Sequence, residues 1–193
     1  MVCYLDDTLI IGDTVEQTRK SVKAVTRGLE SLGFLIHPGK SVLEPQRVSN
    51  LLGFILNSED MTLRLPEAKM HEIKQLCSEL RLSQSTTIRQ VAKVIGKLVA
   101  AFPAVLYGPL FYRSIEKDKV VALKLHRGHF DRKMSLSQES KQELQWWVLM
   151  SNRRICQLED LTPQSKSVQM LVVVAGVPLT YTIPQGVGGM KMN

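Results

Sequence analysis

Apolar residues near the start of the chain form two short runs that flank an acidic pair. The runs cover residues 2–5 and 8–11, and Asp6 and Asp7 lie between them. Short aliphatic and aromatic runs on either side of a turn-sized break are typical of a β-hairpin. The pattern therefore predicts a hairpin with Asp6-Asp7 at its turn.

Helical spacing of apolar residues follows in three segments. The first opens with the capping-box pattern Thr14–Gln17 and stops at Gly33. Pro66 opens the second, and the third begins with the capping-box pattern Thr87–Gln90 and ends at Pro103. The residues expected to face inward recur every three or four positions. They are Val22, Val25, Leu29 and Leu32; Met70, Ile73, Cys77 and Leu80; and Ile88, Val91, Ile95, Leu98 and Val99.

Two further helices and three strands complete the expected elements. The helices cover about residues 107–125 and the segment from Ser135 to near Met150. A short strand at Phe34–Ile36 is followed by a turn at His37–Lys40. Two more strands, Leu51–Leu56 and Met61–Leu65, are separated by the polar residues 57–60.

Positive charge is concentrated in the middle of the chain. The protein has 193 residues and a formal net charge of +7. Residues 1–63 contain 6 lysines and arginines against 8 acids, whereas residues 64–133 contain 14 against 6. A surplus confined to one segment indicates a polyanionic partner such as nucleic acid, although a set of solvated helix faces would give the same count.

Cysteine spacing and hydropathy indicate which cellular compartment to expect. Cys3, Cys77 and Cys156 lie far apart and in no metal-ligand spacing, which favours a reducing intracellular compartment, the cytoplasm or nucleus. His126 and His129 are interpreted as part of a basic surface loop. The run at 171–179 is too short to span a bilayer, so no membrane partner is expected.

The acidic pair is the strongest candidate for chemistry. Tight hairpin turns favour Gly or Asn, and adjacent carboxylates repel, so Asp6-Asp7 breaks the local rule in a way that suggests a site. Carboxylates gathered without His or Cys suit a hard cation such as Mg²⁺. A solvated acidic turn is the alternative. An Asp-x-Asp phosphatase motif fails because Tyr4 stands where the nucleophilic carboxylate is required.

Several motifs in order resemble the reverse transcriptases. Tyr4-Leu5-Asp6-Asp7 matches their Tyr-x-Asp-Asp hairpin, and Gly33-Phe34, Lys40-Ser41, Leu52-Gly53-Phe54 and Leu65-Pro66 follow in the family's sequence. The resemblance covers about residues 1–150 and is to retrotransposon polymerases of the DIRS type.

The resemblance implies a role for each matching residue. Asp6 and Asp7 would be catalytic carboxylates that bind Mg²⁺ in a two-metal site, and Lys40 would assist the departing pyrophosphate. Tyr4 would lie beside the template-primer end, which Leu52, Gly53 and Phe54 would grip. Each has a plain alternative, since Tyr4 and Leu52–Phe54 could be packed strand residues and Lys40 a turn lysine.

The basic segment resembles the polymerase thumb. Arg89, Lys93 and Lys97 recur every four residues and therefore share one helix face, which could contact the phosphates of an RNA/DNA template-primer duplex. A solvated lysine stripe is the alternative interpretation. Deoxynucleotide triphosphates would be partners of the intact enzyme.

The expected fold class is α+β, a partial polymerase palm followed by an α-helical thumb and a poorly defined tail. The expected regions are a palm at 1–65, a basic thumb-like region at 66–133, a connecting helix at 134–160 and a degenerate or disordered tail at 161–193. The tail contains no Asp or Glu, which gives no support to a ribonuclease H activity.

The family's third carboxylate and its fingers precede the hairpin, so we expect a palm and thumb fragment that is inactive alone and whose metal site is incomplete. Alternatives are a non-catalytic nucleic-acid-binding remnant of a retroelement and a relic without a stable fold.

Overall fold

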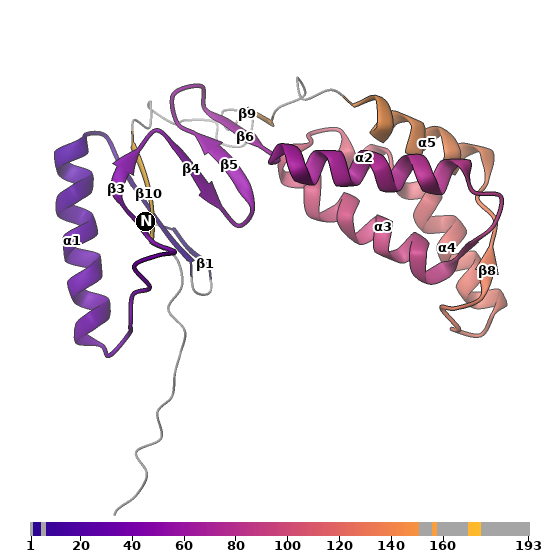
Figure 1. Cartoon of the computed structure of the whole chain (residues 1–193), viewed down its shortest axis with the longest axis horizontal. Helices are drawn as coiled ribbons and strands as arrows, with labels where there is room; N and C mark the ends of the chain where they lie inside the picture. The colour runs from indigo at the N-terminus through magenta and orange to yellow at the C-terminus, as the bar shows by residue number, and fades with distance from the viewer. Residues whose placement is uncertain (1, 5–6, 151–155, 158–169, 175–193) are drawn as a thin grey trace, which may run out of the picture.

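A computed structural model describes residues 2–4, 7–150, 156–157 and 170–174 of the chain, with side chains from 8 to 150. It has a mixed α+β fold, in which a sheet part with one helix and a body of four helices lie end to end (Figure 1). The helices are α1 Val15–Ser31, α2 Glu67–Leu82, α3 Ile88–Ala101, α4 Arg113–Leu125 and α5 Gln138–Leu149.

The first sheet combines segments from both ends of the chain. Its order is β1 (Val2–Tyr4), β2 (Asp7–Gly12), β10 (Met170–Val174) and β3 (Val42–Gln46), and β10 is antiparallel to both of its neighbours. Met170–Val174 thus departs from the degenerate or disordered tail expected at 161–193. This segment is Met-Leu-Val-Val-Val, a short apolar run suited to an interior strand.

Strand β3 was absent from the sequence prediction because Pro45 interrupts its apolar pattern. The structure places β3 at the edge of the first sheet. An edge strand tolerates proline, since one side of its backbone has no neighbour to bond. Whether residues 42–46 form a strand therefore depends on their pairing with β10.

The second sheet has the order β4 (Val48–Leu51), β5 (Phe54–Asn57), β6 (Thr62–Arg64) and β9 (Cys156–Gln157), all antiparallel. The expected single strand Leu51–Leu56 is wrong, because a two-residue turn at Leu52-Gly53 divides it into β4 and β5. The expected strand at Met61–Leu65 is confirmed within one residue at each end as β6.

Helix α1 begins as predicted and ends in a way that removes an expected strand. Leu32 is 74% exposed at its C-terminal end, so its predicted inward orientation is wrong. The Thr14 hydroxyl accepts a hydrogen bond from the Gln17 N–H. At the other end Gly33 has a φ of 87°, and the N–H of Phe34 donates to the carbonyl of Leu29, which closes the helix in a Schellman motif. Phe34–Ile36 is irregular rather than a strand, because the Phe34 amide is used by this helix end.

The helical body contains the largest core. All four predicted residues of α2, from Met70 to Leu80, are buried. Helix α3 has the predicted capping box at Thr87 and buries Ile88, Val91, Ile95 and Leu98. Val99 is 44% exposed, so its predicted inward orientation is wrong. Val94 takes that inward place instead, because it shares a face with Val91 and Leu98.

The helix expected at 107–125 begins only at Arg113. Two 3-10 turns, η1 (Phe102–Ala104) and η2 (Gly108–Leu110), each contain a proline and fill the connection from α3. The carboxylate of Glu143 accepts hydrogen bonds from the N–H groups of Ser114 and Ile115, which fixes the start of α4.

Helix α5 belongs to the helical body rather than standing apart as a connection. Leu144 and Trp147 are completely buried in the core that α2, α3 and α4 share. The indole N–H of Trp147 donates to the carbonyl of Phe111 at 2.7 Å. A two-stranded pair, β7 (Thr86–Thr87) and β8 (Lys133–Met134), closes the far end of the body.

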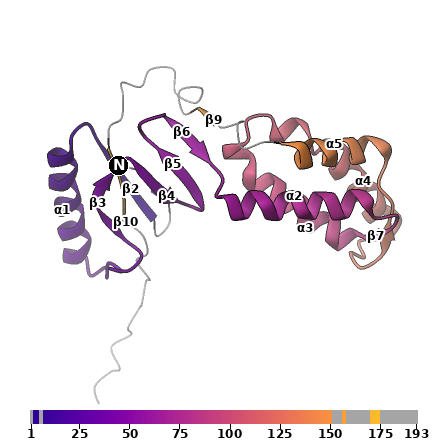
Figure 2. The same ribbon diagram turned by 45° about the horizontal axis from the view of Figure 1, so that its top comes forward.

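The turned view shows the same end-to-end arrangement, with α2 leading away from the β4–β5–β6 sheet (Figure 2). Leu65, between β6 and α2, packs against the helical core, and β6 lies beside η1. The two parts therefore meet at the start of α2.

Candidate nucleic-acid interface

The predicted hairpin at the start of the chain is present. Strands β1 and β2 pair antiparallel, and Tyr4 is opposite Asp7, so residues 5 and 6 form the link. Asp7, which was predicted to lie in the turn, is therefore the first residue of β2. Asp6 and the side chains of Tyr4 and Asp7 lie outside the described residues.

Strand β2 is packed on both faces just beyond the hairpin link. Leu9 is 6% exposed and packs with Leu56 of β5, whereas Ile10 is 2% exposed and packs with Val22 of α1. Residues 9 and 10 point to opposite faces of a strand, so the two clusters fix the register of the hairpin. Asp7 thus begins a strand that is packed on both faces.

The turn at Leu52-Gly53 has unusual backbone geometry. Leu52 has a φ of 50° and Gly53 a φ of 77°, and Leu51 pairs with Phe54 on either side. Positive φ at both central residues is the requirement of a type I′ hairpin turn. Glycine meets it freely but leucine does not, and Leu52 is also 45% exposed. A strained and exposed apolar residue at a turn is typical of a functional position.

Lys69 of α2 holds this turn. Its ammonium group donates a hydrogen bond of 3.0 Å to the carbonyl oxygen of Gly53 and lies 5.9 Å from the centroid of the Phe54 ring. The segment that resembles the primer grip is thereby bonded to the first turn of the helical body.

The basic face of α3 is partly neutralised within the protein. Arg89 makes a two-pronged ion pair with Asp131, at 2.7 and 3.0 Å, and lies over the Phe130 ring. The pair raises the pKa of Arg89 and lowers that of Asp131 through their shared hydrogen bonds.

Lys97 is paired as well, at 2.9 Å from Glu72 of α2. Its hydrogen bond lowers the pKa of Glu72, and the charges of Lys93 and Lys69 add to this effect. Lys93 makes no ion pair with any residue in the described ranges. Lys93 is therefore the cation of this face most available to a phosphate.

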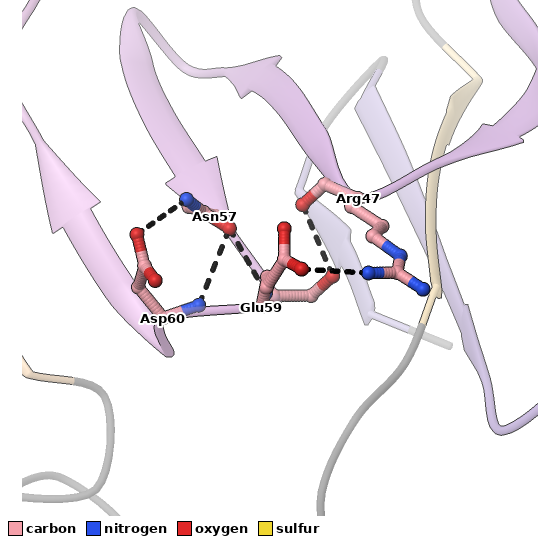
Figure 3. A network of polar contacts seen from close by, with 5 residues as sticks. Arg47, Asn57, Glu59 and Asp60 are labelled. Carbon is pink, nitrogen blue, oxygen red and sulfur yellow. Dashed lines mark hydrogen bonds and ion pairs between the residues drawn. The ribbon is translucent and has the colours of Figure 1, made fainter.

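The acidic turn between β5 and β6 does not resemble a metal site. The side-chain NH₂ of Asn57 donates to the carboxylate of Asp60, and the backbone N–H groups of Glu59 and Asp60 donate to the side-chain oxygen of Asn57 (Figure 3). Arg47 makes an ion pair with Glu59 at 2.7 Å. The hydroxyl of Ser58 donates to the carbonyl of Arg47. These carboxylates are engaged in closing their own turn.

Lys40 lies in an exposed turn, as predicted. Its backbone N–H and that of Ser41 donate to the carbonyl of His37. Lys40 makes no ion pair with a described residue. Its ammonium group is free to approach a polyphosphate, and no described contact joins it to the hairpin.

Two residues that sequence reasoning missed contact the predicted ones. Lys69 bonds Gly53 and lies over Phe54, and Glu72 pairs with Lys97. A cleft of about 130 Å³ lies between α2 and α3, with Lys69, Glu72 and Lys97 among its lining residues. The sequence signal that could have identified Lys69 is its position, since a lysine in the first turn of a helix opposes the helix dipole.

Two adjacent carboxylates are oxygen donors of the kind that Mg²⁺ prefers, and Asp7 lies at the end of the β1–β2 ladder. Among the described residues there is no group of three acidic, histidine or cysteine side chains that could hold a metal ion.

No helix in the described part of the chain combines the length and apolar character needed to cross a membrane. No family model matches the chain, and neither a curated protein nor a solved structure matches it.

Proposed function

We propose that this chain carries the palm hairpin and thumb of a reverse transcriptase of retrotransposon type and binds a template-primer duplex. In this proposal Asp6 and Asp7 bind Mg²⁺, the turn at Leu52-Gly53-Phe54 holds the primer end, and the basic face of α3 contacts the phosphate backbone. The sequence motifs supply the identity of these parts, and the geometry of the turn supplies the main structural support.

The observation that carries the proposal is the strained turn between β4 and β5. It falls on the three residues that resemble the family's primer grip, it exposes Leu52, and it lies against the first turn of α2. A plain core strand, which was the alternative for Leu52–Phe54, would have neither a turn nor a leucine with positive φ. The turn instead presents backbone and an apolar side chain to a ligand beside the helical body.

Electrostatics favour a duplex as that ligand. A polymerase must hold nucleic acid without reading sequence, which phosphate contacts achieve. Lys93 makes no ion pair with a described residue, whereas Arg89 and Lys97 are paired with exposed carboxylates. Such exposed pairs contribute only about 0–1 kcal/mol each, so a phosphate can replace the carboxylate at small cost.

Asp6 and Asp7 would hold the metal ions at the hairpin, together with oxygen ligands from other groups. Bound Mg²⁺ would activate the primer hydroxyl and neutralise the triphosphate. Lys40, with its free ammonium group, would donate a proton to the departing pyrophosphate or stabilise its charge. The turn at Leu52-Gly53-Phe54 and the basic face of α3 would position the duplex.

The test is binding of a fluorescent RNA/DNA template-primer duplex across a salt series. The triple variant Arg89→Met/Lys93→Met/Lys97→Met should reduce the slope of log affinity against log salt by about 2 to 3, since each phosphate contact contributes about 0.9. Lys20→Met/Lys23→Met/Arg27→Met on α1 removes the same charge from another surface and is the matched control. Equal slopes for the two triple variants would contradict the proposal.

A Mg²⁺ series separates the polymerase from a non-catalytic nucleic-acid-binding remnant. Mg²⁺ should strengthen binding of a duplex with a bound nucleotide in the unmodified chain and not in Asp6→Asn/Asp7→Asn. If the double variant responds to Mg²⁺ as the unmodified chain does, the acids have no metal role and the chain is a binding remnant.

A further inference from the structure

Lys69 occupies a position that helix electrostatics disfavour. It is the third residue of α2, where the unpaired N–H groups create a partial positive charge. A cation there weakens the helix unless another contact offsets the repulsion. The carbonyl of Gly53 at 3.0 Å and the face of the Phe54 ring at 5.9 Å provide that contact.

Both contacts lie on the same two-residue turn. The turn is already limited in sequence by positive φ at Leu52 and Gly53. A Cβ atom built at Gly53 would meet the flexible end of the Lys69 side chain, so the lysine lies closely over the turn.

The Lys69 contact continues into the helical body through charge. Lys69 helps to lower the pKa of Glu72, one helical turn further along α2, and Glu72 pairs with Lys97 of α3. Lys69 and Lys97 thus both act on Glu72, Lys97 through a hydrogen bond and Lys69 through its charge alone. These three side chains also line the cleft between α2 and α3.

Lys69 lies in the first turn of α2, close to the junction of the two parts of the fold. The sheet part and the helical body meet at the start of α2 (Figures 1 and 2), and Leu65 packs on the helical core there. The bond from α2 to the β4–β5 turn attaches the turn to the helical body at this junction.

We propose that Lys69 is a positioning residue for the primer end. It fixes the Leu52-Gly53 turn against α2, so that a duplex bound along α3 meets the turn at one fixed distance. This role rests on the proposed function, because it requires a duplex on the helical body.

The first experiment uses the full chain without nucleic acid. Amide hydrogen exchange at residues 52–54 should be about fivefold faster in Lys69→Met, which keeps the side-chain stem and loses the charged hydrogen bond. Lys74→Met, on the same helix, removes an equal charge that makes no ion pair with a described residue, and it should leave this exchange unchanged. Lys69→Arg keeps a donor and should restore slow exchange.

The second experiment maps the primer. The photo-reactive residue p-benzoylphenylalanine replaces Asn50, which is exposed on β4 beside the turn, and is cross-linked to a bound RNA/DNA template-primer duplex. In the otherwise unmodified chain the cross-links should concentrate at one primer nucleotide. In Lys69→Met they should spread to neighbouring nucleotides, while duplex affinity stays within about twofold of Lys74→Met. Lys69→Arg should bring the single position back.

The outcomes separate this proposal from the proposed function. If the unmodified chain binds the duplex and Lys69→Met gives the same exchange and cross-links as Lys74→Met, the positioning role is overturned and duplex binding stands. If the unmodified chain does not bind the duplex, the proposed function fails, and the positioning role fails with it even when exchange at the turn responds to Lys69→Met.

Discussion

The helical body and the sheet part differ in how completely they are packed. The helical body holds one continuous core that includes Trp147, Leu144 and Leu98, all with no exposed surface. The described sheet part has two small clusters instead, one around Leu9 and one around Ile10. Burial of apolar side chains is the main source of stability, so the helical body should be the more stable of the two.

The difference teaches where the candidate chemistry can lie. The acidic hairpin and the strained turn belong to the thinly packed part, and the basic face proposed to contact phosphates belongs to the firmly packed part. Elements that must adjust to a ligand are drawn from regions of low local stability. In the proposed function the helical body would be the fixed support, and Lys69 bonds it directly to the turn.

The largest expected loss of stability comes from removing the side chain at the centre of the helical core. Trp147→Ala deletes a completely buried ring that stacks near Phe102 and bonds the Phe111 carbonyl, so it should cost about 4 kcal/mol of unfolding free energy. Urea unfolding followed by helical circular dichroism measures it. Val99→Ala on the exposed side of α3 should change stability by less than about 0.5 kcal/mol, and similar losses in both would contradict the central place of Trp147 in the helical core.

The sheet part can be opened by itself. Val172→Pro removes a backbone N–H from β10, which lies between β2 and β3, and should cost on the order of 3 kcal/mol locally. Hydrogen exchange of residues 9–11 should become roughly 100-fold faster, while exchange in α3 stays unchanged. An equal acceleration in α3 would show that the two parts unfold as one unit.

A smaller effect concerns the pH dependence of the helical body. Burial raises the pKa of Asp118, but hydrogen bonds from Ser140 and Ser137 at the start of α5 exceed it and leave the pKa lowered. A lowered folded-state pKa gives stability that is complete above the unfolded pKa near 4 and is lost as the pH falls through the folded value.

Asp118→Ala should therefore cost about 1 to 2 kcal/mol at pH 7 and progressively less below pH 4. Urea unfolding at several pH values measures the difference from the unmodified chain. A cost that stays constant down to pH 2 would contradict the role of the carboxylate.

The smallest effect concerns the ion pair between α2 and α3 within the helical body. Glu72→Gln releases Lys97 from its ion pair and should raise duplex affinity by about threefold at low salt, because an exposed pair contributes well under 1 kcal/mol. Glu30→Gln on α1 makes the same charge change and is the control in fluorescence anisotropy. An equal gain in both would mean that only net charge matters.

Local signals predicted the helical body well. Thr87 with Gln90, Pro66 and the spacing of the apolar residues in α2 and α3 act within one or two turns of helix, so the sequence itself contains the information. The prediction for Val99 is wrong because apolar character at the margin of the apolar face of a helix does not decide between packing and exposure.

The sheet part was predicted less well because its order depends on distant partners. Strand β3 and the inner place of Met170–Val174 depend on pairing across more than a hundred residues. The turn at Leu52-Gly53 was read as strand, since leucine rarely adopts positive φ. The hairpin was predicted, but its turn was placed one residue late at Asp7. Lys69 was missed because its partner is a backbone carbonyl sixteen residues away.

The central claim is that the hairpin acids hold a metal ion beside the end of a bound primer. Fe²⁺ can replace Mg²⁺ and, with ascorbate and peroxide, generates radicals that cleave nucleic acid next to the metal. With a labelled template-primer duplex, cleavage should concentrate at the primer end in the unmodified chain and disappear in Asp6→Asn/Asp7→Asn. Even cleavage along the duplex, or the same pattern in the double variant, would contradict the claim.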